Sequence, residues 1–411
     1  MNDAPAQQSP FWSIFTIFLR LGLTSFGGPV AHLGYFREEF VARRQWLSER
    51  DYADLVALCQ FLPGPASSQV GMALGLGRGG YTGALAAWLG FTLPSAILLI
   101  LFALGITHYS DVLPPGALHG LKVVAVAVVA QAVWGMARHL CPDVPRISIM
   151  AAAACAVLLF SSTWTQVGVI IGAGALGLWL FDTAVFNSAS DSTLHSSAVH
   201  PTSTRRHRRT GALWLSIFAV LLIALPIIAH AFSSHTLAII DAFYRAGSLV
   251  FGGGHVVLPL LQAEVVPTDW VNEDAFLAGY GAAQAVPGPL FTFAAFLGAS
   301  MQGFSSGWLG GIIAVVAIFL PSFLLIAGAL PYWDVWRGNY RVQAALTGVN
   351  AGVVGLLLAA LYDPVWTSAI YSVQDFALAL VALIALVFWK LPPWLVVIAC
   401  GVAGWGLSVA F

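Results

Sequence analysis

The sequence predicts an all-α polytopic membrane protein built from two inverted homologous repeats, each with re-entrant broken-helix hairpins plus transmembrane helices. Three observations predict this class: an apolar composition, motifs that occur twice in order, and arginines concentrated in one of two matching loops. Of the 411 residues, 59% are hydrophobic and only 9% are charged, whereas soluble domains carry about 25% charged residues. Continuous apolar runs of about 20 residues fit a hydrocarbon core and favour helices over a barrel, whose strands alternate.

Composition and spacing argue against several other kinds of site. The net charge of −1 suggests no nucleic-acid partner. The four cysteines are scattered singly and the ten histidines lack ligand spacing, so we expect no metal and no cofactor. An enzyme would need a nucleophile beside a base, or a metal cluster, and the sequence offers neither, so we expect no catalytic residues. No Lys or Arg precedes Arg20, and we expect no cleavable signal peptide.

Four motifs of the first half return in the same order in the second half. The pairs are FGG (Phe18–Gly28 and Phe243–Gly253), PGP (Gln60–Pro65 and Gln284–Pro289), LPS (Thr92–Ser95 and Phe319–Ser322), and LHGLK with LTGVN (Leu118–Lys122 and Leu346–Asn350). The offset between copies changes by only a few residues, which indicates duplication of one unit. We therefore divide the chain into a first repeat at 1–183, a polar linker at 184–211, and a second repeat at 212–411 that begins with one extra transmembrane helix.

The linker contains a Ser- and Thr-rich stretch that ends in the arginine cluster RRHRR, at 205–209. Few apolar residues are available there to form a packed core, so we expect disorder. Nucleic-acid binding by the arginines is an alternative, but a cytoplasmic topology anchor is the better interpretation.

Charge distribution predicts how the repeats face the membrane. The loop after the first FGG motif, at 35–51, carries Arg37, Arg43, Arg44 and Arg50, whereas the matching loop at 260–274 has no Lys or Arg. Cationic loops stay cytoplasmic, so these loops face opposite sides and the repeats are inverted, as in many secondary transporters. If the FGG and PGP segments are re-entrant hairpins rather than simple spans, 14 of the 17 Lys and Arg residues are cytoplasmic and none is outside.

The remaining three cations, Arg20, Lys122 and Arg245, then lie within the membrane. The hairpin tips expose backbone N–H groups and positive helix N-termini, which suit an anion. We therefore predict one anion site between the tips. The candidate substrate-binding residues are Arg20, Gly27, Gly28, Gln60, Pro63, Gly64, Pro65, Lys122, Arg245, Gly252, Gly253, Gly254, His255, Gln284, Pro287, Gly288, Pro289 and Asn350.

Structural roles compete with these assignments. Arg20 could snorkel or pair with Glu38 or Asp54, and Lys122 could snorkel as well. His255 is better explained as a packed or hydrogen-bonding residue than as a proton relay. The two glutamines, Gln60 and Gln284, could bind a ligand or another helix. No buried carboxylate pair is evident in the sequence, so the coupling ion stays open.

At these motifs the chain resembles the chromate transporter (CHR) family, in its long two-repeat form. The resemblance rests on FLRLGLTSFGGPVAHLGYFREEF, QFLPGPASSQVG and GFTLPSA in the first half, and on GGGH and QAVPGP in the second. It covers roughly residues 11–139 and 240–362. The halves differ where Pro29 matches Gly254 and where Lys122 matches Asn350, so equal roles for the two halves do not follow.

The resemblance implies a bacterial inner-membrane exporter of chromate, a dianion similar to sulfate, that confers chromate resistance and depends on the membrane potential or proton gradient. The mechanism we expect is alternating access. A sulfate or other oxyanion transporter, or an anion channel of the same fold, remains the alternative. The expected partners are a chromate- or sulfate-like oxyanion and the lipid bilayer, and a homodimer is an open possibility.

Overall fold

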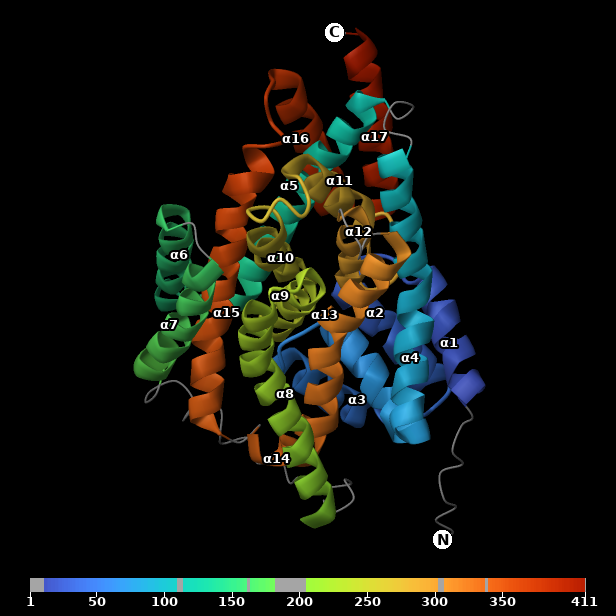
Figure 1. Cartoon of the computed structure of the whole chain (residues 1–411), viewed down its shortest axis with the longest axis vertical. Helices are drawn as coiled ribbons and strands as arrows, with labels where there is room; N and C mark the ends of the chain where they lie inside the picture. The colour runs from blue at the N-terminus through green and yellow to red at the C-terminus, as the bar shows by residue number, and fades with distance from the viewer. Residues whose placement is uncertain are drawn as a thin grey trace.

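The computed structural model describes residues 11–108, 114–160, 163–181, 205–301, 307–336 and 339–410. Within these ranges the chain is helical and contains no strand (Figure 1). Five of the described helices or helical segments are long and apolar enough to cross a membrane, and six shorter helices are apolar as well. The predicted all-α polytopic membrane fold is therefore confirmed.

The first repeat forms helices that break at the predicted motifs. Its elements are α1 (Phe11–Thr24), α2 (Gly28–Arg37), the π-helical turn η1 (Glu38–Arg43), α3 (Glu49–Phe61), α4 (Ala66–His108), α5 (Pro115–Leu140), α6 (Val144–Leu159) and α7 (Thr163–Phe181). Helix α1 ends at Thr24, just before Gly27 and Gly28 of the FGG motif, and α3 ends at Phe61, just before Pro63 of the PGP motif. In α4, non-helical dihedral angles at Gly79 and Gly80 mark a kink.

The second repeat follows the same order after one additional helix. Its elements are α8 (Arg205–Phe232), α9 (His235–Leu249), η3 (Gly254–Val256), α10 (Val257–Val265), α11 (Glu273–Ala283), η4 (Leu290–Thr292), α12 (Phe293–Ser300), α13 (Gly307–Ala329), η5 (Leu330–Tyr332), α14 (Trp333–Trp336), α15 (Tyr340–Ala360), η6 (Leu361–Trp366), α16 (Val373–Val387) and α17 (Pro393–Ala410). The helix α8 begins at Arg205, so the last residues of the predicted linker are helical. The rest of that linker, 184–204, lies outside the described residues.

The segment around the first FGG motif is a hairpin whose two arms lie side by side. The ring of Phe18 on α1 is 5.7 Å from the ring of Phe36 on α2 and 5.1 Å from that of Phe40 on η1. In the second repeat, Arg245 on α9 pairs with Glu264 on α10 across the matching hairpin. Both FGG segments thus form hairpins, and each one turns at its glycines.

The two repeats make equivalent contacts. A Cβ atom on Gly120 of α5 would collide with the backbone of α17, and a Cβ on Gly348 of α15 would collide with the backbone of α7. These two positions occupy matching places in the LHGLK and LTGVN motifs. The α6–α7 pair therefore packs on a helix of the second repeat, and the α16–α17 pair packs on a helix of the first.

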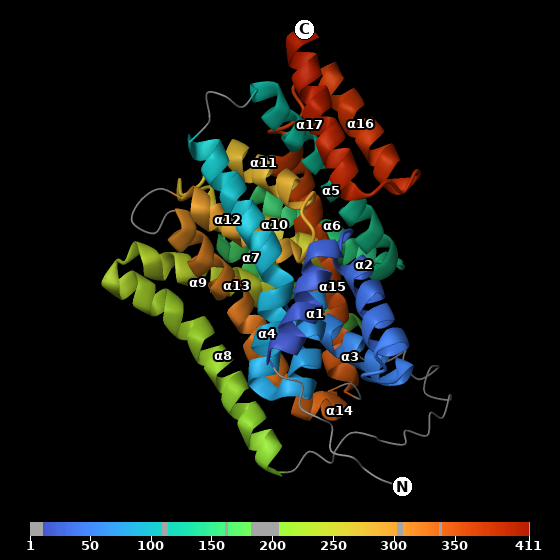
Figure 2. The ribbon, with the colours of Figure 1, turned by 90° about the vertical axis from the view of Figure 1, so that its right-hand side faces the viewer.

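The repeats are oriented oppositely. Both views show α3 in the lower half of the molecule near α14, and its counterpart α11 in the upper half (Figures 1 and 2). The helices α4 and α13, which carry the LPS motifs, pack against each other at the centre. This arrangement brings all four helix breaks to the interface between the repeats.

Candidate functional site

Each PGP break is hydrogen-bonded to the FGG break of the other repeat. The backbone N–H of Gly64 donates to the carbonyl oxygen of Val250 at 2.7 Å, and that of Gly288 donates to the carbonyl oxygen of Ser25 at 3.0 Å. Ser25 and Val250 occupy matching positions, two residues before the glycines of each FGG motif. The breaks therefore form one hydrogen-bonded centre. In each repeat, the PGP break donates a backbone hydrogen bond to the FGG break of the other repeat.

Glycine is required at both PGP breaks. Gly64 has φ +120° and Gly288 has φ +109°, which L side chains rarely adopt. A Cβ atom on Gly64 would also overlap the Ser322 hydroxyl, and one on Gly288 would crowd the Ser95 hydroxyl. These serines belong to the LPS motif of the opposite repeat, so the two duplicated motifs fit into each other.

Two cavities adjoin this centre. The larger, of about 610 Å³, is lined by Gln60, Gly64, the second FGG glycines and Asn350, among others. The smaller, of about 160 Å³, is lined by Gln284, Gly288 and the first FGG glycines, among others. They share Gly27, Ala132 and His255.

The cavities are counterparts of each other under the repeat. Cys59, Gln60, Leu62, Gly64 and Ala66 line the larger one. Their equivalents line the smaller one: Ala283, Gln284, Val286, Gly288 and Leu290. Equivalent residues of the two repeats thus line both cavities, although one cavity is large and the other is small.

Four helical segments begin at these cavities. Gly28 starts α2, Ala66 starts α4, Gly254 starts η3 and Leu290 starts η4, and all four residues line one cavity or the other. Helix N-termini present free N–H groups and a partial positive charge. The Nε2 of Gln284 is buried with no hydrogen-bond partner among the described residues. The centre therefore offers donors to an anion from backbone and amide groups.

Most of the predicted site residues meet here. The predicted glycines, both glutamines, His255 and Asn350 line the two cavities. The four prolines, Pro63, Pro65, Pro287 and Pro289, flank the PGP glycines in the chain. None of the three predicted cations appears among the described residues that line either cavity.

Two of the three cations instead contact carboxylates. Lys122 contacts Asp274, with 2.7 Å between Nζ and Oδ1. Arg245 contacts Glu264, with 2.9 Å between Nη2 and Oε2, and also contacts Asp241. Arg20 is exposed on α1.

The Arg20 charge acts on Glu39. Burial raises the pKa of the Glu39 carboxyl, but the hydrogen bond and charge of Arg44, followed by the charge of Arg43 and last that of Arg20, lower it below its usual value. The partners of the duplicated arginines were not recognised from sequence, although one signal was available. Glu39 and Glu264 are separated by the same offset as Arg20 and Arg245. The duplicated arginine therefore accompanies a duplicated glutamate.

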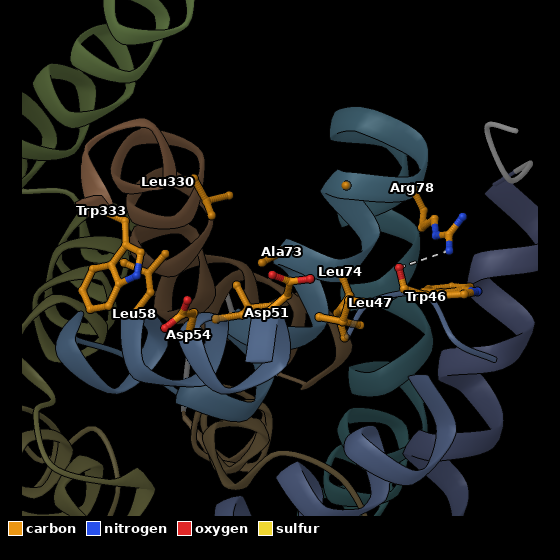
Figure 3. A pocket seen from close by; sticks show the side chains of 12 residues that line it. Trp46, Leu47, Asp51, Asp54, Leu58, Ala73, Leu74, Arg78, Leu330 and Trp333 are labelled. Carbon is orange, nitrogen blue, oxygen red and sulfur yellow. Dashed lines mark hydrogen bonds between the residues drawn. The ribbon is translucent and has the colours of Figure 1, made fainter. Parts of the chain in front are cut away.

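Another pocket, of about 220 Å³, is lined by residues of α3, α4, η5 and α14 and of the loop before α3 (Figure 3). Asp51 and Asp54 line it. The guanidinium of Arg78 donates a hydrogen bond to the Trp46 carbonyl oxygen at 3.3 Å and lies over the indole ring of Trp46. Two carboxylates would repel an anion, so this pocket is a poor candidate for the anion site.

A family model described as chromate transporter matches residues 12–178 and 237–405, which together make up most of the chain. The chain belongs to the chromate transporter family. Each matched region lies within one of the two repeats, and the whole of α8 lies between the matched regions.

Curated relatives agree with this assignment. A chromate transport protein of Pseudomonas aeruginosa is 30% identical over 98% of this chain and 95% of the relative. A probable chromate transport protein of Synechococcus elongatus is 27% identical over 94% of this chain and 93% of its own length. A chromate transport protein of Cupriavidus metallidurans is 25% identical over 89% of this chain and 84% of its length. No solved structure matches the chain.

Proposed function

We propose that this protein exports chromate across a bacterial inner membrane by alternating access and thereby confers chromate resistance. Membership of the family supports chromate as the substrate. The observation that carries the mechanism is the pair of equivalent cavities with unequal volumes, about 610 and 160 Å³. In inverted-repeat transporters, exchanging the conformations of the repeats opens the opposite side.

The contacts beside the smaller cavity support its being the closed side. The cavity is lined by Val128 of α5 and Gln284 just beyond α11. Further along, the same two helices are joined by the ion pair of Lys122 with Asp274. A Cβ atom on Gly281 of α11 would collide with the α5 backbone, so the helices approach very closely there. The larger cavity lies between Gln60 on α3 and Asn350 on α15, the counterparts of these helices.

In this mechanism the dianion binds at the helix starts, and the amide groups of Gln60, Gln284 and Asn350 complete its hydrogen bonds. The three predicted cations then stabilise the hairpins and the closed side rather than contact the substrate. An inside-negative potential favours outward movement of negative charge by about 2.3 kcal/mol per charge per 100 mV. For a dianion this amounts to about 4.6 kcal/mol per 100 mV, so export needs no ATP.

The test is uptake of labelled chromate into inside-out membrane vesicles, with sulfate as competitor. We expect saturable uptake that is inhibited more strongly by unlabelled chromate than by sulfate. Replacing Gln284 with alanine removes a hydrogen bond to a charged group, worth about 1.5–3 kcal/mol. The chromate concentration for half-maximal uptake should therefore rise about 10- to 150-fold.

The exposed Gln374, on α16 and away from both cavities, provides a matched control. Gln374→Ala should transport with the normal concentration dependence. Uptake that never saturates would indicate a channel, and stronger inhibition by sulfate than by chromate would reassign the substrate. Equal effects of the two substitutions would remove Gln284 from the anion site.

A further inference from the structure

In the second repeat, two carboxylates share one arginine. The Nη2 of Arg245 lies 3.0 Å from Oδ2 of Asp241 and 2.9 Å from Oε2 of Glu264. The side chains of Asp241, Arg245 and Glu264 are only 11%, 17% and 14% exposed. With both carboxylates ionised, this largely buried cluster has a net charge of −1.

A single guanidinium can balance only one of the two carboxylates. An uncompensated charge that is withdrawn from water is costly, and such groups bind a proton instead. Two carboxylates this close titrate as a pair, so one proton is shared by the cluster rather than owned by one residue.

The surroundings supply no second fixed cation. A cavity of about 490 Å³ adjoins all three residues and is otherwise lined by small, polar and aromatic groups that include His230 and His235. The facing part of α7 contributes Gln166. In the described parts of α7 and α13 there is no acidic or basic side chain, and α15 has only Arg341, in its first turn. The helix α8 also packs against α9, but its four arginines lie at 205–209, at the opposite end of α8 from His230.

The first repeat lacks this imbalance. Thr16 stands at the position that matches Asp241. Glu39, the match of Glu264, contacts Arg44 at 2.7 Å and Arg43 at 3.3 Å. The surplus charge there is positive, so the conditions for binding a proton exist in one repeat only.

The cluster lies on the same hairpin as part of the proposed anion site. Asp241 and Arg245 lie on α9, and Glu264 lies on α10, the opposite arm of the same hairpin. Gly252 at the tip of this hairpin lines the larger central cavity. A proton on Glu264 would remove the charge that pairs with Arg245 across the two arms, and so loosen the hairpin whose tip lines the cavity.

We propose that Asp241, Arg245 and Glu264 form a proton-binding site that couples proton entry to chromate export. This inference rests on the proposed transport function. The proton adds to a carboxylate oxygen on one side of the membrane and leaves on the other, and no other bond changes. Because the proton moves inward while the dianion moves outward, the membrane potential drives both.

The experiment uses the purified full chain in proteoliposomes that contain a pH-sensitive dye. Both compartments are kept alkaline so that chromate stays a dianion, and the membrane potential is clamped to zero with valinomycin and equal potassium. Two rates are measured: exchange of labelled chromate at equal pH, and net chromate movement driven by a pH gradient.

For the unchanged protein we expect gradient-driven chromate flux accompanied by opposite proton flux. Glu264→Gln should keep chromate exchange but lose gradient-driven flux and proton flux by tenfold or more. Glu39→Gln, at the matching position of the first repeat, should keep both fluxes. A purely structural ion pair would instead lower all rates together, in proportion to folded protein.

Chromate exchange at equal pH, combined with no proton flux and no chromate movement under the pH gradient in the unchanged protein, would overturn this inference and leave the proposed function intact. Absence of chromate exchange would overturn the proposed function itself. If Glu264→Gln does not fold, Asp241→Asn takes its place. Proton flux that persists in the folded variant would also refute the assignment.

Discussion

Substituting Gly64 with alanine tests the contact by which the two repeats complete each other. At φ +120° an L residue is strained, at a cost of about 1–3 kcal/mol. The new Cβ atom would overlap Ser322 of the opposite repeat, which adds about 1–3 kcal/mol of overpacking. We therefore expect Gly64→Ala to lower the free energy of unfolding by about 2–6 kcal/mol, a large share of a typical total of about 5–15 kcal/mol.

The assay is thermal unfolding of detergent-solubilised protein, followed by fluorescence-detected gel filtration. For units of about 150–250 residues, each kcal/mol shifts the midpoint by about 2–4 °C, so a loss of about 4 °C or more is expected. Gly105→Ala is the matched control, because this α4 glycine has nothing within 4 Å of a Cβ atom. That change should be neutral or stabilise by up to about 1 kcal/mol. Equal midpoints for the two variants would refute the proposed fit between PGP and LPS motifs.

Three further predictions concern topology, the linker and the first arginine. A membrane-impermeant thiol reagent applied outside should label a cysteine introduced at Asn272 and spare one at Ser48, since arginine-rich loops stay cytoplasmic; the reverse pattern would contradict the inverted topology. Deleting residues 196–203 should leave chromate uptake nearly intact, and loss of uptake by protein that still reaches the membrane would show that the linker does more than connect. Arg20→Gln should reduce the amount of folded protein while the chromate affinity of the folded fraction, measured in vesicles, stays normal; weaker affinity would return Arg20 to the anion site.

Local signals in the sequence predicted the helix breaks correctly. Closely spaced glycines and prolines disfavour a continuous helix, so the FGG and PGP breaks could be located without tertiary information. Their duplication and the arginine asymmetry then predicted that the breaks meet between inverted repeats. The hydrogen bond from Gly64 to Val250 and its counterpart from Gly288 bear out this meeting of the breaks.

The surroundings of the cations could not be predicted in the same way. Whether a buried lysine contacts a substrate or a carboxylate depends on tertiary packing, and the partner of Lys122 is Asp274, 152 residues further along the chain. The ion pair of Arg245 with Asp241 was easier to predict, because Asp241 precedes Arg245 by one helical turn. The difference in volume between the two cavities could not be predicted from sequence either, because nearly identical motifs line both of them.

The most direct test of the central claim is whether chromate protects the cavity from chemical modification. Gln60 is exposed and lines the larger cavity, so a cysteine at this position, with the four native cysteines replaced, should be alkylated readily in membranes. We predict that saturating chromate slows this alkylation about tenfold or more, with no effect on a cysteine at Gln374. Alkylation at position 60 that proceeds at the same rate with and without chromate would contradict an anion site at the glycine breaks.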